Sequence, residues 1–225
     1  CTVIVFAVRR WLCLMVVGLS MAATSAQSAE SDTAITDPQY ASAYKQFRLL
    51  QEAVLAKRDS DAKRAGDACV TTLDALIQRQ PRSFEALALQ SACYGYLANL
   101  GGMAAIRNGS RSGKSIEAAL ALAPKNPRVI LVDGFGLYFR PKFVGGDKGK
   151  GCARIREATQ AFDSNNSNGV ASVSSSALDW GAAEAHYWSG RCARDAGDTT
   201  TARAEFEKAL ALDPNLTVAK KALGR

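Results

Sequence analysis

Apolar side chains recur every three or four positions along the chain from residue 37 to its end. This spacing places them on one face of a helix. The alternation of Val, Ile and Thr that is typical of strands is nearly absent. The pattern predicts helices over 37–58, 61–80, 83–100, a stretch ending at 122, 126–139, 148–162, 179–196, 199–212 and 216–223. We therefore expect an all-α protein.

Prolines follow several of these helices at related distances. Pro81 and Pro124 are 43 residues apart, and Pro124 and Pro214 are 90 apart, close to twice that spacing. A period between 20 and 50 residues indicates stacked helical hairpins, because one hairpin cannot bury its apolar face alone. Residues 163–178, rich in Ser and Asn, form the internal segment with the least ordered composition.

The last hairpin has a specific signature. Gly190, Ala202, Phe206, Ala209 and Pro214 stand at the spacings of the tetratricopeptide repeat, with Gly197-Asp198 at the turn. Residues 183–216 therefore resemble that family. Parts of the pattern recur earlier, at Tyr94, Ile116, Ala119, Pro124 and Gly134. The resemblance implies a right-handed α-solenoid of antiparallel hairpins over 37–225; HEAT-like or other solenoid packing is the alternative.

The resemblance also implies where a partner would bind. In this family the first helix of each hairpin lines a concave groove that holds a peptide or protein. By register, the groove-facing side chains of the last repeat are Glu184, Tyr187, Arg191 and Arg194, with Arg128 and Tyr138 in comparable places. Tyr and Arg often contribute most of the binding energy at interfaces.

The first residues read as a secretory signal peptide. Arg9 and Arg10 precede an apolar run of 13 residues, 11–23, and small residues follow around Ser25-Ala26. This run is too short for a stable transmembrane helix of about 20 residues. We expect a signal peptide over 1–26, a flexible segment over 27–36 and a periplasmic or secreted protein without stable membrane insertion after cleavage. An uncleaved membrane anchor is the alternative.

The charge changes this picture little. The net charge of +7 falls to +5 when the two arginines of residues 1–26 are removed. A basic balance can indicate nucleic acid or an anionic membrane surface, but an exported protein rarely meets nucleic acid. The one local concentration is Arg140, Lys142, Lys148 and Lys150, which we interpret as a solvated face.

Two glycine-rich runs invite a phosphate-binding interpretation. The run 109–115, GSRSGKS, lacks the glycine that a P-loop needs at Asn108, and it follows a helix instead of a strand. The run 145–151, GGDKGKG, could bind an anion at a helix N-terminus. We favour a tight hairpin turn that Asp147 caps, and leave the anion site open.

No catalytic or metal-binding constellation emerges. His186 is the only histidine, so a catalytic triad or a histidine-based metal site would have this one imidazole at most. Its position in the repeat predicts a core or half-exposed packing residue. Asp179 and Glu184 are expected to be ordinary acids near a helix start. We predict no enzyme, no cofactor and no metal.

The four cysteines after residue 26 predict two disulfides. Cys69 stands 12 residues before Pro81 and Cys93 stands 12 after it, so two antiparallel helices would hold both at the same height. Cys152, 10 residues before Phe162, and Cys192, 13 after residue 179, are also about level. Thiols that meet in an oxidising compartment pair. Four buried free thiols are the alternative.

These observations support two functions. The first is an exported scaffold that binds an unidentified protein or peptide in its groove, and the second is a small-ligand carrier or transporter accessory protein. A scaffold predicts an open groove rimmed by mixed charge. A carrier predicts a closed apolar pocket with a few converging polar groups.

Overall fold

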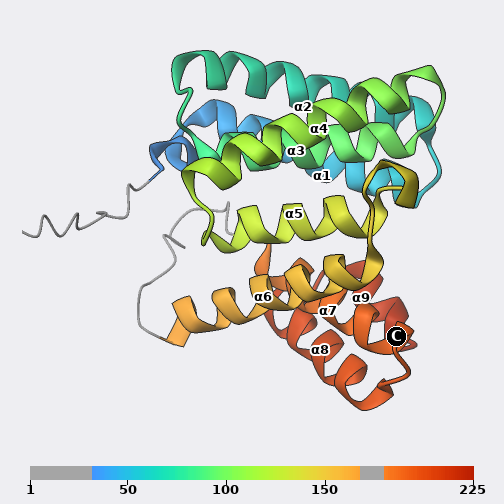
Figure 1. Cartoon of the computed structure of the whole chain (residues 1–225). Coiled ribbons are helices and arrows are strands. Elements are labelled where there is room, and N and C mark those ends of the chain that lie inside the picture. The colour runs from blue at the N-terminus through green and yellow to red at the C-terminus, as the bar shows by residue number, and fades with distance from the viewer. Residues whose placement is uncertain (1–31, 168–179) are drawn as a thin grey trace, which may run out of the picture. The chain divides into compact units, whose positions relative to one another are not determined.

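The computed structural model describes residues 32–167 and 180–225, and in this part of the chain all regular structure is helical (Figure 1). The predicted signal peptide (1–26), residues 27–31 and most of the predicted polar linker lie outside the described residues. The elements are η1 (Thr33–Thr36), α1 (Pro38–Leu55), α2 (Asp59–Arg79), α3 (Phe84–Asn99), α4 (Met103–Leu122), α5 (Pro127–Phe139), η2 (Lys142–Val144), α6 (Lys148–Ser167), α7 (Ala182–Asp195), α8 (Thr199–Leu212) and α9 (Thr217–Ala222). The predicted all-α fold is confirmed.

Successive helices pair as antiparallel hairpins: α1 with α2, α3 with α4, α5 with α6 and α7 with α8. Between hairpins, α2 packs on α3 and α6 packs on α7, while α3 also contacts α1 and α5. Three apolar clusters follow this order. The first joins α1–α5 and Trp180, the second joins α5–α7, and the third joins α7–α9. Each hairpin thus buries its apolar face on a neighbour, as repeat architectures require.

Local sequence sets most of the helix starts. Asp37, Ser83 and Asn126 are N-caps whose side chains accept hydrogen bonds from backbone N–H groups of the first turn. Pro38 and Pro127 follow two of these caps at the first helical position, where proline is tolerated because that N–H has no partner in the helix.

Two segment predictions need correction. Residues 33–36, expected to be flexible, form η1, and Ala34 is fully buried. This segment is ordered because the Asp32 carboxylate accepts hydrogen bonds from Ser83 Oγ at 3.0 Å and from the Glu85 N–H at 2.8 Å. At the other boundary, α6 continues to Ser167 instead of ending at Phe162, so the first part of the Ser/Asn run is helical.

The structure places the predicted cysteine pairs together. Cys69 of α2 meets Cys93 of α3 with Cα atoms 6.5 Å apart, and Cys152 of α6 meets Cys192 of α7 with Cα atoms 5.7 Å apart. Both separations lie in the range of protein disulfides. Each pair joins the second helix of one hairpin to the first helix of the next, which is the stacking order that the sequence predicted.

The loop between α5 and α6 is a tight turn. The Asp147 N–H donates to the Leu137 carbonyl at 2.8 Å, and the Asp147 carboxylate accepts the Lys150 N–H at 3.0 Å. The hydrogen bond that the carboxylate accepts from the Lys150 N–H is the main cause that lowers the pKa of the Asp147 carboxyl. Because this carboxylate already occupies the N-terminus of α6, the structure favours the capping role over a bound anion.

Candidate functional site

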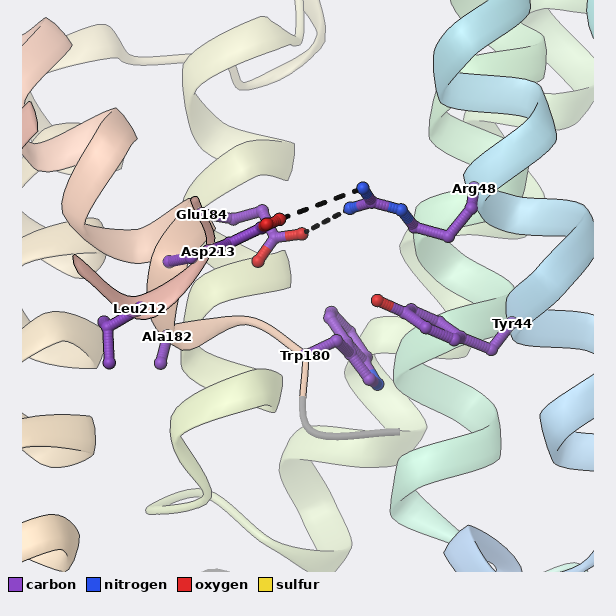
Figure 2. A pocket seen from close by; sticks show the side chains of 8 residues that line it. Tyr44, Arg48, Trp180, Ala182, Glu184, Leu212 and Asp213 are labelled. Atoms are coloured by element: carbon purple, nitrogen blue, oxygen red, sulfur yellow. Dashed lines mark hydrogen bonds and ion pairs between the residues drawn. The ribbon is translucent and has the colours of Figure 1, made fainter. Parts of the chain in front are cut away.

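A pocket of about 300 Å³ lies between α1 and the α7–α8 hairpin (Figure 2). Its walls come from three places in the sequence, and its lining residues are Tyr44, Arg48, Trp180, Ala182, Ala183, Glu184, Leu212 and Asp213. Figure 2 shows Arg48 reaching from α1 toward Glu184 and Asp213, with the rings of Tyr44 and Trp180 beside it. The first helices of the first and last hairpins therefore meet at one site.

The pocket contains one cation and two carboxylates. Arg48 Nη1 lies 3.3 Å from Glu184 Oε1, and Arg48 Nη2 lies 4.0 Å from Asp213 Oδ2. Glu184 also accepts a hydrogen bond from the Gly181 N–H at 3.1 Å at the start of α7. Since the guanidinium faces two carboxylates, the site carries a net negative charge.

Aromatic rings form the adjoining wall. The Tyr44 and Trp180 rings are stacked with centroids 6.2 Å apart and an interplanar angle of 25°, an arrangement typical of favourable aromatic pairs. Burial, with Glu184 nearby, raises the pKa of Tyr44 to about 12, so its hydroxyl stays protonated at neutral pH. Leu212, 48% exposed, supplies an accessible apolar contact.

A buried polar network fixes Trp180 in place. Trp180 Nε1 donates to the Tyr40 hydroxyl at 2.8 Å, and the Trp180 carbonyl accepts a hydrogen bond from Arg128 Nε at 2.8 Å. Glu85 accepts from Tyr40 at 3.4 Å and from Arg128 at 3.1 Å. Tyr40, Glu85 and Arg128 belong to α1, α3 and α5. The first helices of three hairpins therefore hold Trp180, which lies just before the fourth hairpin in the chain.

Charge in this network is compensated. Burial raises the pKa of the Glu85 carboxyl, while the Arg128 guanidinium acts in the opposite direction. The carboxylate is 5% exposed and the guanidinium 12% exposed, so removing either partner would leave a poorly solvated charge. Arg128, predicted to face a partner, therefore bonds to Glu85 and Trp180 inside the chain.

The other predicted groove residues are spread over different surroundings. Tyr187 is 7% exposed and packs on Phe206, so its predicted exposure is wrong. Tyr138 is also 7% exposed and donates to Asp195 at 3.1 Å. Arg191, half-buried, donates to the Tyr187 hydroxyl at 3.1 Å. Only Glu184 of the predicted set lines the pocket, and Arg194 is exposed elsewhere on α7.

Register explains these errors. The sequence shows that α7 has an apolar stripe, but α6, α8 and the end of α5 all pack on that helix. Several of its faces are therefore covered. The lining residues missed by the sequence analysis, above all Arg48 and Trp180, stand 132 positions apart in the chain. A local signal existed only in the aromatic stripe of the first helix.

The single histidine is a buried packing residue, as predicted. His186 is 2% exposed, with Nδ1 2.8 Å from Glu205 Oε2 and Nε2 3.2 Å from Asp163 Oδ1. The pKa of Glu205 is lowered because hydrogen bonding and charge from His186 and Lys208 outweigh its desolvation. Among the described residues, no group of three or more His, Cys, Asp or Glu side chains is placed so that it could hold a metal ion. The imidazole thus links α6, α7 and α8.

The run 109–115 does not form a phosphate loop. It lies inside α4, where Ser112 bonds to Ser91 and Ser115 Oγ donates to Gln90 Oε1 at 2.6 Å. These hydroxyls join α4 to α3 instead of facing a ligand.

The α7–α8 hairpin has the close helix approach that its sequence signature implies. A Cβ atom at Gly190 would lie 2.7 Å from Phe206 Cε1 and 3.0 Å from the Ala202 carbonyl oxygen, so only glycine fits there. Residues 183–216 match the family model described as tetratricopeptide repeat. This segment is a tetratricopeptide repeat. The repeat covers the hairpin for which the sequence showed the resemblance, and it supplies Ala183, Glu184, Leu212 and Asp213 to the pocket.

A solved structure is also similar to the chain. A thermophilic tetratricopeptide repeat protein of Thermus thermophilus is similar over 80% of this chain and 96% of its own, with a TM-score of 0.48 and 15% sequence identity. No curated protein matches the chain significantly in sequence.

Proposed function

We propose that the protein is an exported, non-catalytic interaction scaffold that binds a segment of a partner protein in the pocket between α1 and its tetratricopeptide repeat. The observation that carries this proposal is the pocket itself. It combines an aromatic wall, an exposed leucine and three charged side chains, two of which, Arg48 and Glu184, stand on the first helices of their hairpins. Tetratricopeptide repeats are generally scaffolds, which supports a binding role over catalysis.

The charges of the pocket indicate the chemistry of the bound segment. Glu184 and Asp213 outnumber Arg48, so a Lys or Arg side chain of the partner would be attracted there. Tyr44 and Leu212 offer apolar area beside the charges. We infer an extended segment with one basic and one apolar side chain, bound next to the end of α8.

The carrier alternative receives less support. A carrier would hold its ligand in a closed apolar chamber, whereas this pocket is rimmed by charge. A second hollow, of about 310 Å³, is likewise polar and is lined by Asp74, Gln90, Tyr94, Arg111, Lys114 and Ser115. Export is supported by the apolar run of residues 11–23 and by two cysteine pairs placed for disulfides.

Site-specific photocrosslinking tests the proposal. With a photoreactive residue in place of Leu212, we expect a discrete crosslinked partner in producing cells, and at least about a fivefold loss of that product after Asp213→Lys. Arg203→Ala is the matched control, because Arg203 forms an exposed pair with Glu207 on the same hairpin. The proposal fails if the photoreactive residue gives the same products at the exposed Leu55, or if Asp213→Lys leaves the product unchanged.

A further inference from the structure

Two turns of the chain expose large apolar side chains. At the start of α4, Met103 is 94% and Ile106 is 82% exposed; in η2, Phe143 is 89% and Val144 is 50% exposed. We call these four residues the apolar tips. Single exposed apolar residues are common, but several gathered in one region indicate an interaction surface.

The two turns lie at the same end of their helices. The chain reverses between α4 and α5, so the start of α4 and the end of α5 point the same way (Figure 1). The side chain of Arg140, at the base of the second turn, reaches the middle of α4, where its Nη2 lies 3.9 Å from the place that a Cβ of Gly113 would take. The apolar tips therefore stand at the same end of the antiparallel helices α4 and α5.

The η2 turn holds its apolar side chains outward. The Val144 N–H and the Gly146 N–H both donate to the Pro141 carbonyl, at 3.1 Å and 3.0 Å. Gly145 has φ of 88°, a value that favours glycine. Because the backbone is fixed in this way, Phe143 is presented to solvent without a local rearrangement.

The sequence segments that carry the apolar tips are basic. Between residues 86 and 116 the sequence has no Asp or Glu, and between 134 and 156 the only acid is Asp147. That carboxylate caps α6. The exposed cations near the tips are Arg107, Lys142, Lys148 and Lys150. Positive charge beside protruding apolar groups complements a surface that is anionic outside and apolar beneath.

We propose that the apolar tips and the surrounding lysines form a peripheral contact with an anionic lipid membrane. Phe143 and its neighbours insert between headgroups, and the lysines bind lipid phosphates. A bilayer fits separate protruding tips because its surface is fluid, whereas a protein partner would need a matching pocket for each. None of the described helices is long and apolar enough to cross a membrane. This inference is independent of the partner pocket.

Vesicle sedimentation with the full chain tests the proposal. We expect the protein to bind vesicles with about one third phosphatidylglycerol more tightly than vesicles of phosphatidylcholine alone, and added salt to weaken binding. Phe143→Ser should reduce partitioning to the anionic vesicles about tenfold. Lys142→Gln with Lys150→Gln should reduce it at least about tenfold, since each lysine near such a surface contributes about fivefold.

Matched controls use similar residues elsewhere. Leu49→Ser changes an apolar side chain that is 44% exposed on α1, and Lys220→Gln with Lys221→Gln removes two exposed lysines of α9. Every variant is prepared with the same N-terminus, so a difference between variants reports on the substituted surface. The proposal is overturned if both vesicle types bind equally, if neither binds, or if the tip variants bind like the controls. Crosslinking at Leu212 should persist in Phe143→Ser, which separates this proposal from the partner pocket.

Discussion

At the scale of single residues, glycine decides how closely some helices approach. A Cβ at Gly151 of α6 would lie 2.8 Å from Tyr138 Cα and 2.7 Å from the Tyr138 N atom. Both neighbours are backbone atoms of α5, which cannot move aside as a flexible side chain would. Gly109 of α4 differs, because a Cβ there meets nothing within 4 Å.

Replacing each of these two glycines by alanine should change the free energy of unfolding in opposite directions. Gly151→Ala should lower the free energy of unfolding by about 1–3 kcal/mol, because the added methyl group forces α5 and α6 apart. Gly109→Ala should raise it by about 0.5–1 kcal/mol, since alanine restricts the unfolded chain and favours helix. Urea unfolding followed by circular dichroism measures both. Equal effects at the two positions would contradict the helix contact described here.

At the scale of elements, stability depends on how each hairpin is joined to the next. α3 is buried on nearly all sides because α1, α2, α4 and α5 surround it. The cysteine pairs reinforce the two junctions α2–α3 and α6–α7. Both junctions lie between successive hairpins.

We predict that the protein made in an oxidising compartment carries the bonds Cys69–Cys93 and Cys152–Cys192. Each bond should stabilise the fold by about 2–4 kcal/mol, mainly by restricting the unfolded chain. Peptide mapping without reductant identifies the pairs, and unfolding with and without reductant measures their contribution. In the variant Cys152→Ser/Cys192→Ser, reductant should lower the free energy of unfolding by about half as much as it does in the unchanged protein. A Cys69–Cys152 link or four free thiols would disprove the pairing.

At the scale of the whole molecule, contacts distant in sequence complete the site. Trp180 bonds to Tyr40 across 140 positions, and Arg48 pairs with Glu184 across 136. The pocket therefore depends on the packing of residues 32–225 as one unit, and a fragment that lacks α1 would lose its Tyr44–Arg48 wall.

The proposed export also concerns the whole chain. We predict that the processed protein begins at Gln27, within about three residues, because small residues follow the short apolar run. Mass spectrometry of the protein from a cell-envelope extract measures the N-terminus. An intact N-terminus in the membrane fraction would show that residues 1–26 act as an anchor. Replacing Ala26 by a large residue should block cleavage at this site, with Ala41→Leu as the control.

The sequence by itself determined the helices, their pairing as hairpins and the cysteine partners. These follow from local spacing: caps and prolines mark helix ends, and equal distances from a turn bring two antiparallel positions level. Only the tertiary structure decided which face of each helix meets which neighbour. Tyr187 is buried because Phe206 covers it, and Arg128 is enclosed because Glu85 and Trp180 lie beside it. Such contacts join residues that no local pattern relates, so the pocket of Arg48, Glu184 and Asp213 appears only when the hairpins are packed.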